Sequence, residues 1–141
     1  MTGYKELVIY IDGASKGNPG QAGIGAVIKD SRKNVIKRLS KGIGLATNNV
    51  AEYYACIYAL QEALILRAEV LTVYTDSQLL VNQLKGNFKV KSSNLKPLHT
   101  QVLYLLKGFK KIYLRHINRE ENKEADKLAN QALQPVPSNL E

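Results

Sequence analysis

Apolar positions in the first third of the chain are grouped in short runs, which is typical of strands. Residues 7–11 (LVIYI) are apolar at every position, so this strand is predicted to lie in the centre of a sheet, covered on both faces. A glycine-rich turn follows. Residues 24–30 and 34–44 are then predicted as two more strands, joined as a hairpin by the polar segment DSRKN.

The middle of the chain has the spacing of a long helix, predicted over residues 47–68. Asn48 or Asn49 is suited to cap its first turn. Small and apolar side chains then recur at helical intervals, at Ala55, Ala59, Ala63 and Leu66. This stripe is predicted to pack against the sheet.

Short strands and helices alternate over the rest of the chain. They are predicted as strand 70–76, helix 77–86, helix 95–109, strand 110–117 and helix 119–133. Asn118 and Glu121 are placed to form a capping box before the last helix, and Pro135 and Pro137 are placed to end it. Because helices connect the later strands, the first, fourth and fifth strands are predicted to run parallel. The sequence therefore predicts an α/β fold with one mixed sheet flanked by helices. We expect a single domain over residues 1–134 and a flexible C-terminal tail over residues 135–141.

The composition is that of a globular chain with a basic balance. Of 141 residues, 45% are hydrophobic and 23% are charged, which excludes wholesale disorder. The net charge of +8 favours a polyanionic partner, of which nucleic acid is the commonest. Charge alone is also compatible with a protein that is merely basic.

Cysteine usage and the lack of long apolar runs bear on location. Cys56 is the only cysteine, so no intrachain disulfide can form and a reducing compartment fits. No segment is apolar enough for a signal peptide or a membrane span. We therefore expect a cytoplasmic protein with no membrane association, and we expect a monomer.

Four acidic residues stand at positions that favour convergence. Asp12 and Asp76 each follow an apolar strand, at the edge of the sheet where α/β proteins bind ligands. Glu52 shares a helix face with the alanines predicted to face the sheet. Asp126 lies at the edge of the apolar stripe of the last helix. One end of the sheet could thus collect four carboxylates.

Each of these acids also has an ordinary structural explanation. Asp12 and Asp76 could form turns or caps at strand ends. Glu52 could simply favour a helix N-terminus, and Asp126 could pair with Lys123 on the surface. These alternatives remain open for each acid taken singly.

Taken together, the four acids indicate metal chemistry. A cluster of carboxylates without cations would repel itself and raise its own pKa values. Oxygen ligands suit Mg²⁺ or Mn²⁺, and the sequence has no Cys/His set for zinc. A basic protein with an acidic metal pocket indicates phosphodiester chemistry with two metal ions.

Four separated segments resemble the signature segments of type 1 ribonuclease H, the ribonuclease HI family, in the family's order. They are DGASKGNPG, TNNVAEYYA, YTDSQ and NKEADKLAN, and the resemblance extends from about Leu7 to Leu133. It implies the ribonuclease H-like fold, a five-stranded mixed sheet with strand order 3-2-1-4-5. It also implies endonucleolytic hydrolysis of the RNA strand of RNA–DNA hybrids, leaving 5′-phosphate and 3′-hydroxyl ends.

The resemblance assigns catalytic and metal-binding roles to Asp12, Glu52, Asp76 and Asp126. It implies two Mg²⁺ ions per site, with Mn²⁺ as a substitute. Asp12 would bridge both ions, and Asp126 would help to hold the ion that activates the attacking water. Glu52 and Asp76 would help to hold the other ion, which stabilises charge on the leaving 3′ oxygen.

Polar residues near these acids are expected to select the substrate. A hybrid differs from DNA by its 2′-hydroxyls, which are read across a wide, shallow minor groove. The family's nucleic-acid-binding positions correspond to Gly13, Asn18, Thr47, Asn48, Ser77, Gln78 and Asn94. Among them, Thr47 and Asn94 match positions that hold a phosphate of the DNA strand. Asn48 and Ser77 have an alternative explanation as helix caps.

One departure from better-known bacterial members concerns their long basic handle, which is rich in lysine and tryptophan. Here the segment after Gly86 is only NFKVKSSN, and the chain has no tryptophan, so the resemblance is to a handle-less subtype. Nearby lysines could supply part of the handle's electrostatic role, or they could belong to a solvated loop: Lys85, Lys89, Lys91 and Lys96. Weaker or more salt-sensitive substrate binding is expected.

A second departure concerns an auxiliary histidine. The spacing from His116 to Asp126 fits the family's histidine, but its surroundings continue a strand, so His116 is expected chiefly to end that strand. Glu120 or Glu121 could then assist metal or product exchange, and His99 is expected to be structural. Two alternatives stay open for the whole chain. The scaffold could also cut double-stranded RNA, or it could be a catalytically weak nucleic-acid-binding module.

Overall fold

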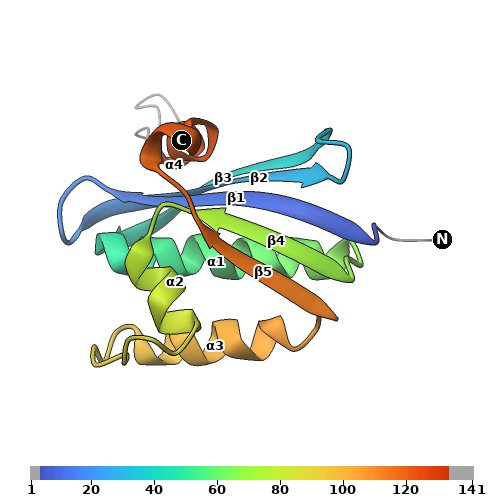
Figure 1. Ribbon diagram of the computed structural model, residues 1–141. Helices are drawn as coiled ribbons and strands as arrows, with labels where there is room; N and C mark the ends of the chain where they lie inside the picture. Colours follow the sequence, from blue (N-terminus) through green and yellow to red (C-terminus); the bar gives the residue numbers. More distant parts are fainter. Residues whose placement is uncertain (1–3, 134–141) are drawn as a thin grey trace.

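A five-stranded sheet with helices on both faces makes up the computed structural model, which describes residues 4–133 (Figure 1). The strands are β1 (Glu6–Ser15), β2 (Gly20–Asp30), β3 (Val35–Ala46), β4 (Val70–Thr75) and β5 (Lys111–His116). The helices are α1 (Asn48–Ile65), α2 (Gln78–Leu84), α3 (Lys96–Leu106) and α4 (Lys123–Gln131), with a 3₁₀ turn, η1 (Arg119–Glu121). The predicted tail and its prolines lie outside the described residues. None of the described helices is long and apolar enough to cross a membrane.

The order of strands in the sheet is β3-β2-β1-β4-β5, as the resemblance implied. β1 pairs in parallel with β4, and β4 with β5, whereas β2 is antiparallel to its neighbours β1 and β3. Ile11 lies opposite Thr75 in the β1–β4 register. Asp12 and Asp76 therefore follow directly on paired residues and lie side by side. Asp76 follows the end of β4 as predicted, but the prediction that a strand ends before Asp12 is wrong, because β1 continues to Ser15 through its pairing with β2.

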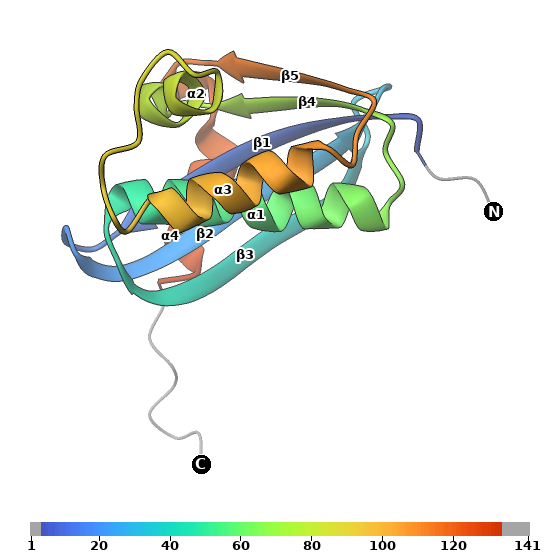
Figure 2. The ribbon, with the colours of Figure 1, turned by 90° about the horizontal axis from the view of Figure 1, so that it is seen from below.

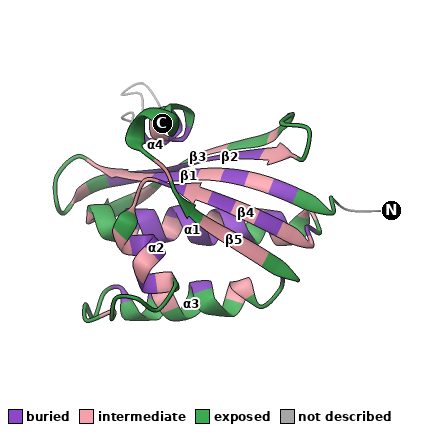
Figure 3. Cartoon of the chain, in the orientation of Figure 1, coloured by how far each residue is buried: buried purple, intermediate pink, exposed green. Residues whose placement is uncertain are grey.

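The two faces of the sheet are covered unequally. α1 and α3 lie on one face, and α4 crosses the other (Figures 1 and 2). In β1 the side chains of Leu7, Ile9 and Ile11 are buried toward α1, but Val8 and Tyr10 on the opposite face are only partly buried (Figure 3). The prediction that this strand is covered on both faces is thus wrong for its first half, because α4 reaches only the end that carries Asp12.

Helix α4 approaches the sheet closely at Gly25, the residue of β2 that pairs with Asp12. A Cβ atom at Gly25 would overlap the carbonyl oxygen of Ala125 and the amide nitrogen of Ala129. Glycine is therefore required here by space. The close approach brings the first turn of α4, and with it Asp126, near Asp12 in β1.

Two predicted helix caps are corrected by the structure. The N-cap of α1 is Thr47, whose Oγ1 accepts a hydrogen bond from the Val50 amide at 3.2 Å, rather than Asn48 or Asn49. Asn48 already has helical geometry as the first residue of α1. The capping box of Asn118 and Glu121 is present, but it begins η1, and α4 starts only at Lys123.

Candidate active site

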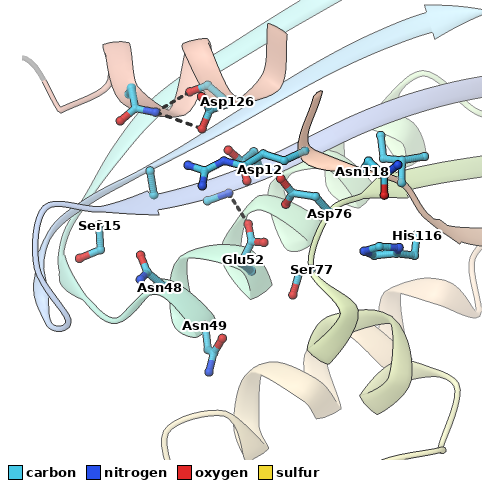
Figure 4. A pocket seen from close by; sticks show the side chains of 15 residues that line it. Asp12, Ser15, Asn48, Asn49, Glu52, Asp76, Ser77, His116, Asn118 and Asp126 are labelled. Carbon is cyan, nitrogen blue, oxygen red and sulfur yellow. Dashed lines mark hydrogen bonds between the residues drawn. The ribbon is translucent and has the colours of Figure 1, made fainter. Parts of the chain in front are cut away.

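Three carboxylates meet where β4 ends beside the middle of β1 (Figure 4). One oxygen each of Asp12, Glu52 and Asp76 lies within 4.8 Å of the others. Asp12 is 5% exposed and Glu52 is 9% exposed, whereas Asp76 is half-buried. They line a pocket of about 640 Å³. Two neighbouring parallel strands and the first turns of α1 thus deliver three acids to one place.

Asp126 lines the same pocket from α4 but lies outside this close group. Its Oδ1 accepts a hydrogen bond from the Nδ2 of Asn130 at 3.3 Å, one helical turn later. The Asp126 carboxyl nevertheless makes a side-chain hydrogen bond with that of Asp12, and this contact adds to the raised pKa of Asp12. The position of this fourth acid relative to the others depends on how α4 sits on the sheet.

Glu52 is held by the backbone of β1. The amide of Gly13 donates a hydrogen bond to the Glu52 carboxylate. A Cβ atom at Gly13 would overlap the backbone of Ala51 and Glu52, so glycine here allows α1 to contact β1 directly. Gly13 is one of the residues predicted to bind nucleic acid, and its amide is thus engaged within the protein.

Burial and mutual repulsion shift the acids in the direction expected for a cluster without cations. Burial raises the pKa of Asp12 to about 10, with Glu52 and Asp76 adding to the effect. Burial and then the charge of Asp76 raise the pKa of Glu52, while the Gly13 amide opposes the shift. Burial also raises the pKa of Asp76, and the nearby Arg119 cation opposes it. Protons or a divalent cation must therefore offset this charge.

The donor atoms fit a hard divalent cation. All three clustered ligands are carboxylate oxygens, and the carboxylate of Asp126 borders the same space. Oxygen-only sites suit Mg²⁺ or Mn²⁺ rather than zinc. The chemistry of the residues present thus agrees with the metal that the sequence indicated.

Mg²⁺ is expected to stabilise the protein more at pH 8 than at pH 5.5. The folded-state pKa values of Asp12 and Glu52 lie above their unfolded values, so these groups stabilise the metal-free fold below about pH 4 and lose this contribution as pH rises toward their folded pKa values. Mg²⁺ must displace these protons from the carboxylate oxygens, and this competition is weaker at pH 8 than at pH 5.5. We expect a rise in Tm of about 5 °C or more at pH 8 with saturating Mg²⁺, and a clearly smaller rise at pH 5.5. NaCl at matched ionic strength is the control. Equal shifts at both pH values would contradict this expectation.

The predicted substrate-binding residues fall into two groups. Asn48, Ser77 and Gly13 line the carboxylate pocket, and Ser77 also caps α2 by accepting a hydrogen bond from the Leu80 amide at 3.2 Å. The remaining predicted residues are not among those that line the pocket: Asn18, Thr47, Gln78 and Asn94. Asn18 is linked to the pocket through its Oδ1, which accepts a hydrogen bond from the Asn48 amide at 3.0 Å.

His116 lines the carboxylate pocket, but the two glutamates before the last helix do not. His116 ends β5 and lines the pocket, whereas Glu120 is exposed and is not among the lining residues. Glu121 accepts a hydrogen bond from the Asn118 amide at 3.2 Å, which gives it a capping role. His99 contacts the Gln83 carbonyl oxygen at 3.2 Å through Nε2, and the Gln83 side chain accepts from the Tyr53 hydroxyl at 2.6 Å. This network joins α1, α2 and α3, which agrees with a structural role for His99.

Sequence reasoning missed Arg119 as a pocket residue. It belongs to η1, lines the carboxylate pocket and opposes the upward pKa shift of Asp76. The sequence placed this arginine in the first turn of the last helix. Its position could have indicated this role, because Arg119 is a cation three residues after His116, where β5 ends at the pocket.

Comparison with known proteins places the chain in a family. A family model described as reverse transcriptase-like matches residues 10–132. The bifunctional protein Rv2228c of Mycobacterium tuberculosis is 43% identical over 129 residues, which cover 91% of this chain and 35% of that protein. Ribonuclease HI of Halobacterium salinarum is 39% identical over 124 residues, which cover 88% of this chain and 62% of that protein. The chain thus spans between about a third and two thirds of the length of these curated relatives.

Solved structures extend the similarity over whole domains. The N-terminal RNase H domain of Rv2228c superposes with a TM-score of 0.88 at 42% identity, covering 92% of this chain and 99% of that chain. RNase H1 of Halobacterium salinarum gives a TM-score of 0.89 at 38% identity, covering 91% and 97%. LC11-RNase H1, from a compost metagenome and in complex with an RNA/DNA hybrid, gives 0.84 at 39% identity, covering 90% and 96%. With this coverage, this strand order and these identities, the chain belongs to the ribonuclease HI family.

Proposed function

We propose that the protein is a metal-dependent endoribonuclease that hydrolyses the RNA strand of RNA–DNA hybrids. The observation that carries the proposal is the meeting of Asp12, Glu52 and Asp76 oxygens within 4.8 Å, in a protein of net charge +8. The similarity to LC11-RNase H1, whose structure contains an RNA/DNA hybrid, supports the hybrid as substrate. An uncompensated acidic pocket would be of little use to a module that only binds nucleic acid.

The four acids would hold two Mg²⁺ ions, for which Mn²⁺ can substitute. When bound, such ions lower the pKa of a water and offset charge on the leaving 3′ oxygen, which yields 5′-phosphate and 3′-hydroxyl ends. Asp12 and Glu52 are buried, so their charges are poorly hydrated and favour cation binding. Arg119 adds a fixed positive charge at the pocket wall, where a phosphate can approach.

Exposed polar groups around the pocket are proposed to select the hybrid. Asn48, Gln78 and Asn94 are exposed, and Asn18 keeps its Nδ2 available while its Oδ1 binds the Asn48 amide. Thr47 Oγ1 accepts a hydrogen bond from the Val50 amide, yet its hydroxyl hydrogen has no acceptor among residues 4–133 and can donate to a DNA phosphate. Capping and substrate contact are thus compatible roles for one side chain.

We further propose that the protein acts as a monomer in the cytoplasm. Cys56 is a buried free thiol, which fits a reducing compartment. The edge strands β3 and β5 carry Lys37, Lys41, Lys111 and Arg115, and charged side chains disfavour pairing with the edge of another sheet.

The test is a labelled RNA–DNA hybrid compared with an RNA duplex, a DNA duplex and a DNA duplex with one embedded ribonucleotide. We expect cleavage of the hybrid with Mg²⁺ or Mn²⁺, none in EDTA, and products whose 3′ ends can be extended by a polymerase. Binding of the hybrid without cleavage would favour the binding module. Cleavage of the RNA duplex at a similar rate would favour the broader substrate range.

A further inference from the structure

Asn122 is a polar residue buried where α4 meets β1. It is 1% exposed, and its Nδ2 donates a hydrogen bond to the carbonyl oxygen of Ile11 at 2.8 Å. Its Oδ1 is also buried and has no hydrogen-bond partner within residues 4–133. An unpaired buried carbonyl oxygen is unfavourable for stability. A requirement for packing alone would therefore favour an apolar side chain at this position.

The hydrogen bonds of Asn122 connect two of the four acids. Its backbone carbonyl accepts the amide of Asp126 at 3.1 Å, one helical turn later. Its side chain holds Ile11, the residue directly before Asp12. Two hydrogen bonds and one peptide step thus lead from the Asp126 backbone to the Asp12 backbone.

Apart from the contact between the Asp126 and Asp12 carboxyls, the polar contacts described between α4 and the sheet lie on the far side of the helix, toward β3. Ser40 donates to the Leu128 carbonyl oxygen at 2.6 Å, and Arg38 pairs with Glu124 at 2.6 Å on the surface. Neither contact involves β1, and an exposed ion pair contributes little to positioning. Close packing at Gly25 sets the height of α4 above the sheet but supplies no directed contact along β1.

We propose that Asn122 is a positioning residue that fixes α4 along β1, so that the Asp126 carboxylate faces that of Asp12. The inference rests on the proposed function in so far as that function assigns both acids to the metal site. The position of Asp126 depends on such a contact more than the positions of the other acids do, because Asp126 alone comes from α4 and lies outside the close group. Residues behind metal ligands typically change metal affinity or activity by about 10-fold to 100-fold.

The experiment compares Asn122→Ala with Leu128→Ala, which removes apolar packing between α4 and the sheet but leaves the Asn122–Ile11 contact intact. Mg²⁺ affinity is measured by calorimetry and by the Mg²⁺ dependence of Tm, and kcat and KM are measured on a hybrid. We expect Asn122→Ala to weaken Mg²⁺ binding by about 10-fold or more and to lower kcat with little change in KM. Leu128→Ala should lower Tm in the absence of metal but keep Mg²⁺ affinity within about 2-fold of wild type.

Two results would overturn the proposal: wild-type Mg²⁺ affinity in Asn122→Ala, or an equal loss of affinity in both variants. If Asn122→Ala does not fold, the milder Asn122→Ser is measured against Leu128→Ala by the same criteria. A wild-type protein that binds Mg²⁺ but leaves hybrids intact contradicts the proposed function alone, since Mg²⁺ affinity still tests the role of Asn122. A wild-type protein that binds no Mg²⁺ contradicts both.

Discussion

Asp12→Asn is expected to lower the rate of hybrid cleavage by at least about 10³-fold while leaving hybrid binding nearly intact. Asp12 is the acid that interacts with all three others: its oxygen lies within 4.8 Å of those of Glu52 and Asp76, and its carboxyl also contacts that of Asp126. An amide keeps the shape of the carboxylate but removes the charge. Initial rates under saturating Mg²⁺ and filter binding of the same hybrid measure the two effects.

The same substitution is expected to stabilise the metal-free protein at pH 8 by about 1 kcal/mol or more. Burial and neighbouring acids raise the pKa of Asp12, so at pH 8 the metal-free protein must either take up a proton on folding or bury an ionised Asp12, and an amide avoids both costs. Urea unfolding in EDTA measures the difference. Glu6→Gln is the control, because Glu6 is an exposed acid on the same strand, and it should change neither activity nor stability. A less stable or fully active Asp12→Asn protein would contradict the assignment of this residue.

Gly25→Ala is expected to destabilise the fold by about 2 kcal/mol or more and to reduce cleavage strongly. The added methyl group would overlap the Ala125 carbonyl and the Ala129 amide, so α4 must move away from the sheet. Such a movement displaces Asp126 from Asp12, which pairs with Gly25 across the sheet. Urea unfolding and the hybrid assay measure the two losses.

Gly42→Ala provides the matched control for this prediction. Among residues 4–133, a Cβ atom at Gly42 would approach only the Ala132 carbonyl oxygen, at 3.3 Å, so a small adjustment accommodates it. Both substitutions add the same methyl group to a strand beneath α4. Equal stability of the two variants would show that the close approach at Gly25 has little energetic importance.

Local patterns in the sequence anticipated much of the architecture. The apolar run before Asp12 predicted β1, and the helical spacing of alanines predicted α1, because these periods reflect burial within one element. The strand order followed from the resemblance and is confirmed. Errors arose where a residue had two competing local roles: Thr47 rather than Asn48 caps α1, because the chain enters the helix one residue earlier.

Local sequence patterns were sufficient to predict that Asp76 follows a strand and that Glu52 faces the sheet, since side-chain direction within a strand or helix repeats with a fixed period. The distances between the acids depend on how the elements pack in three dimensions. It placed Glu52 against the Gly13 amide, set Asp126 at the rim of the close group, and brought Arg119 to the pocket wall. These positions depend on contacts between elements that are far apart in the sequence, such as the contact of Asn122 with Ile11. A local sequence pattern does not specify how closely two such elements pack.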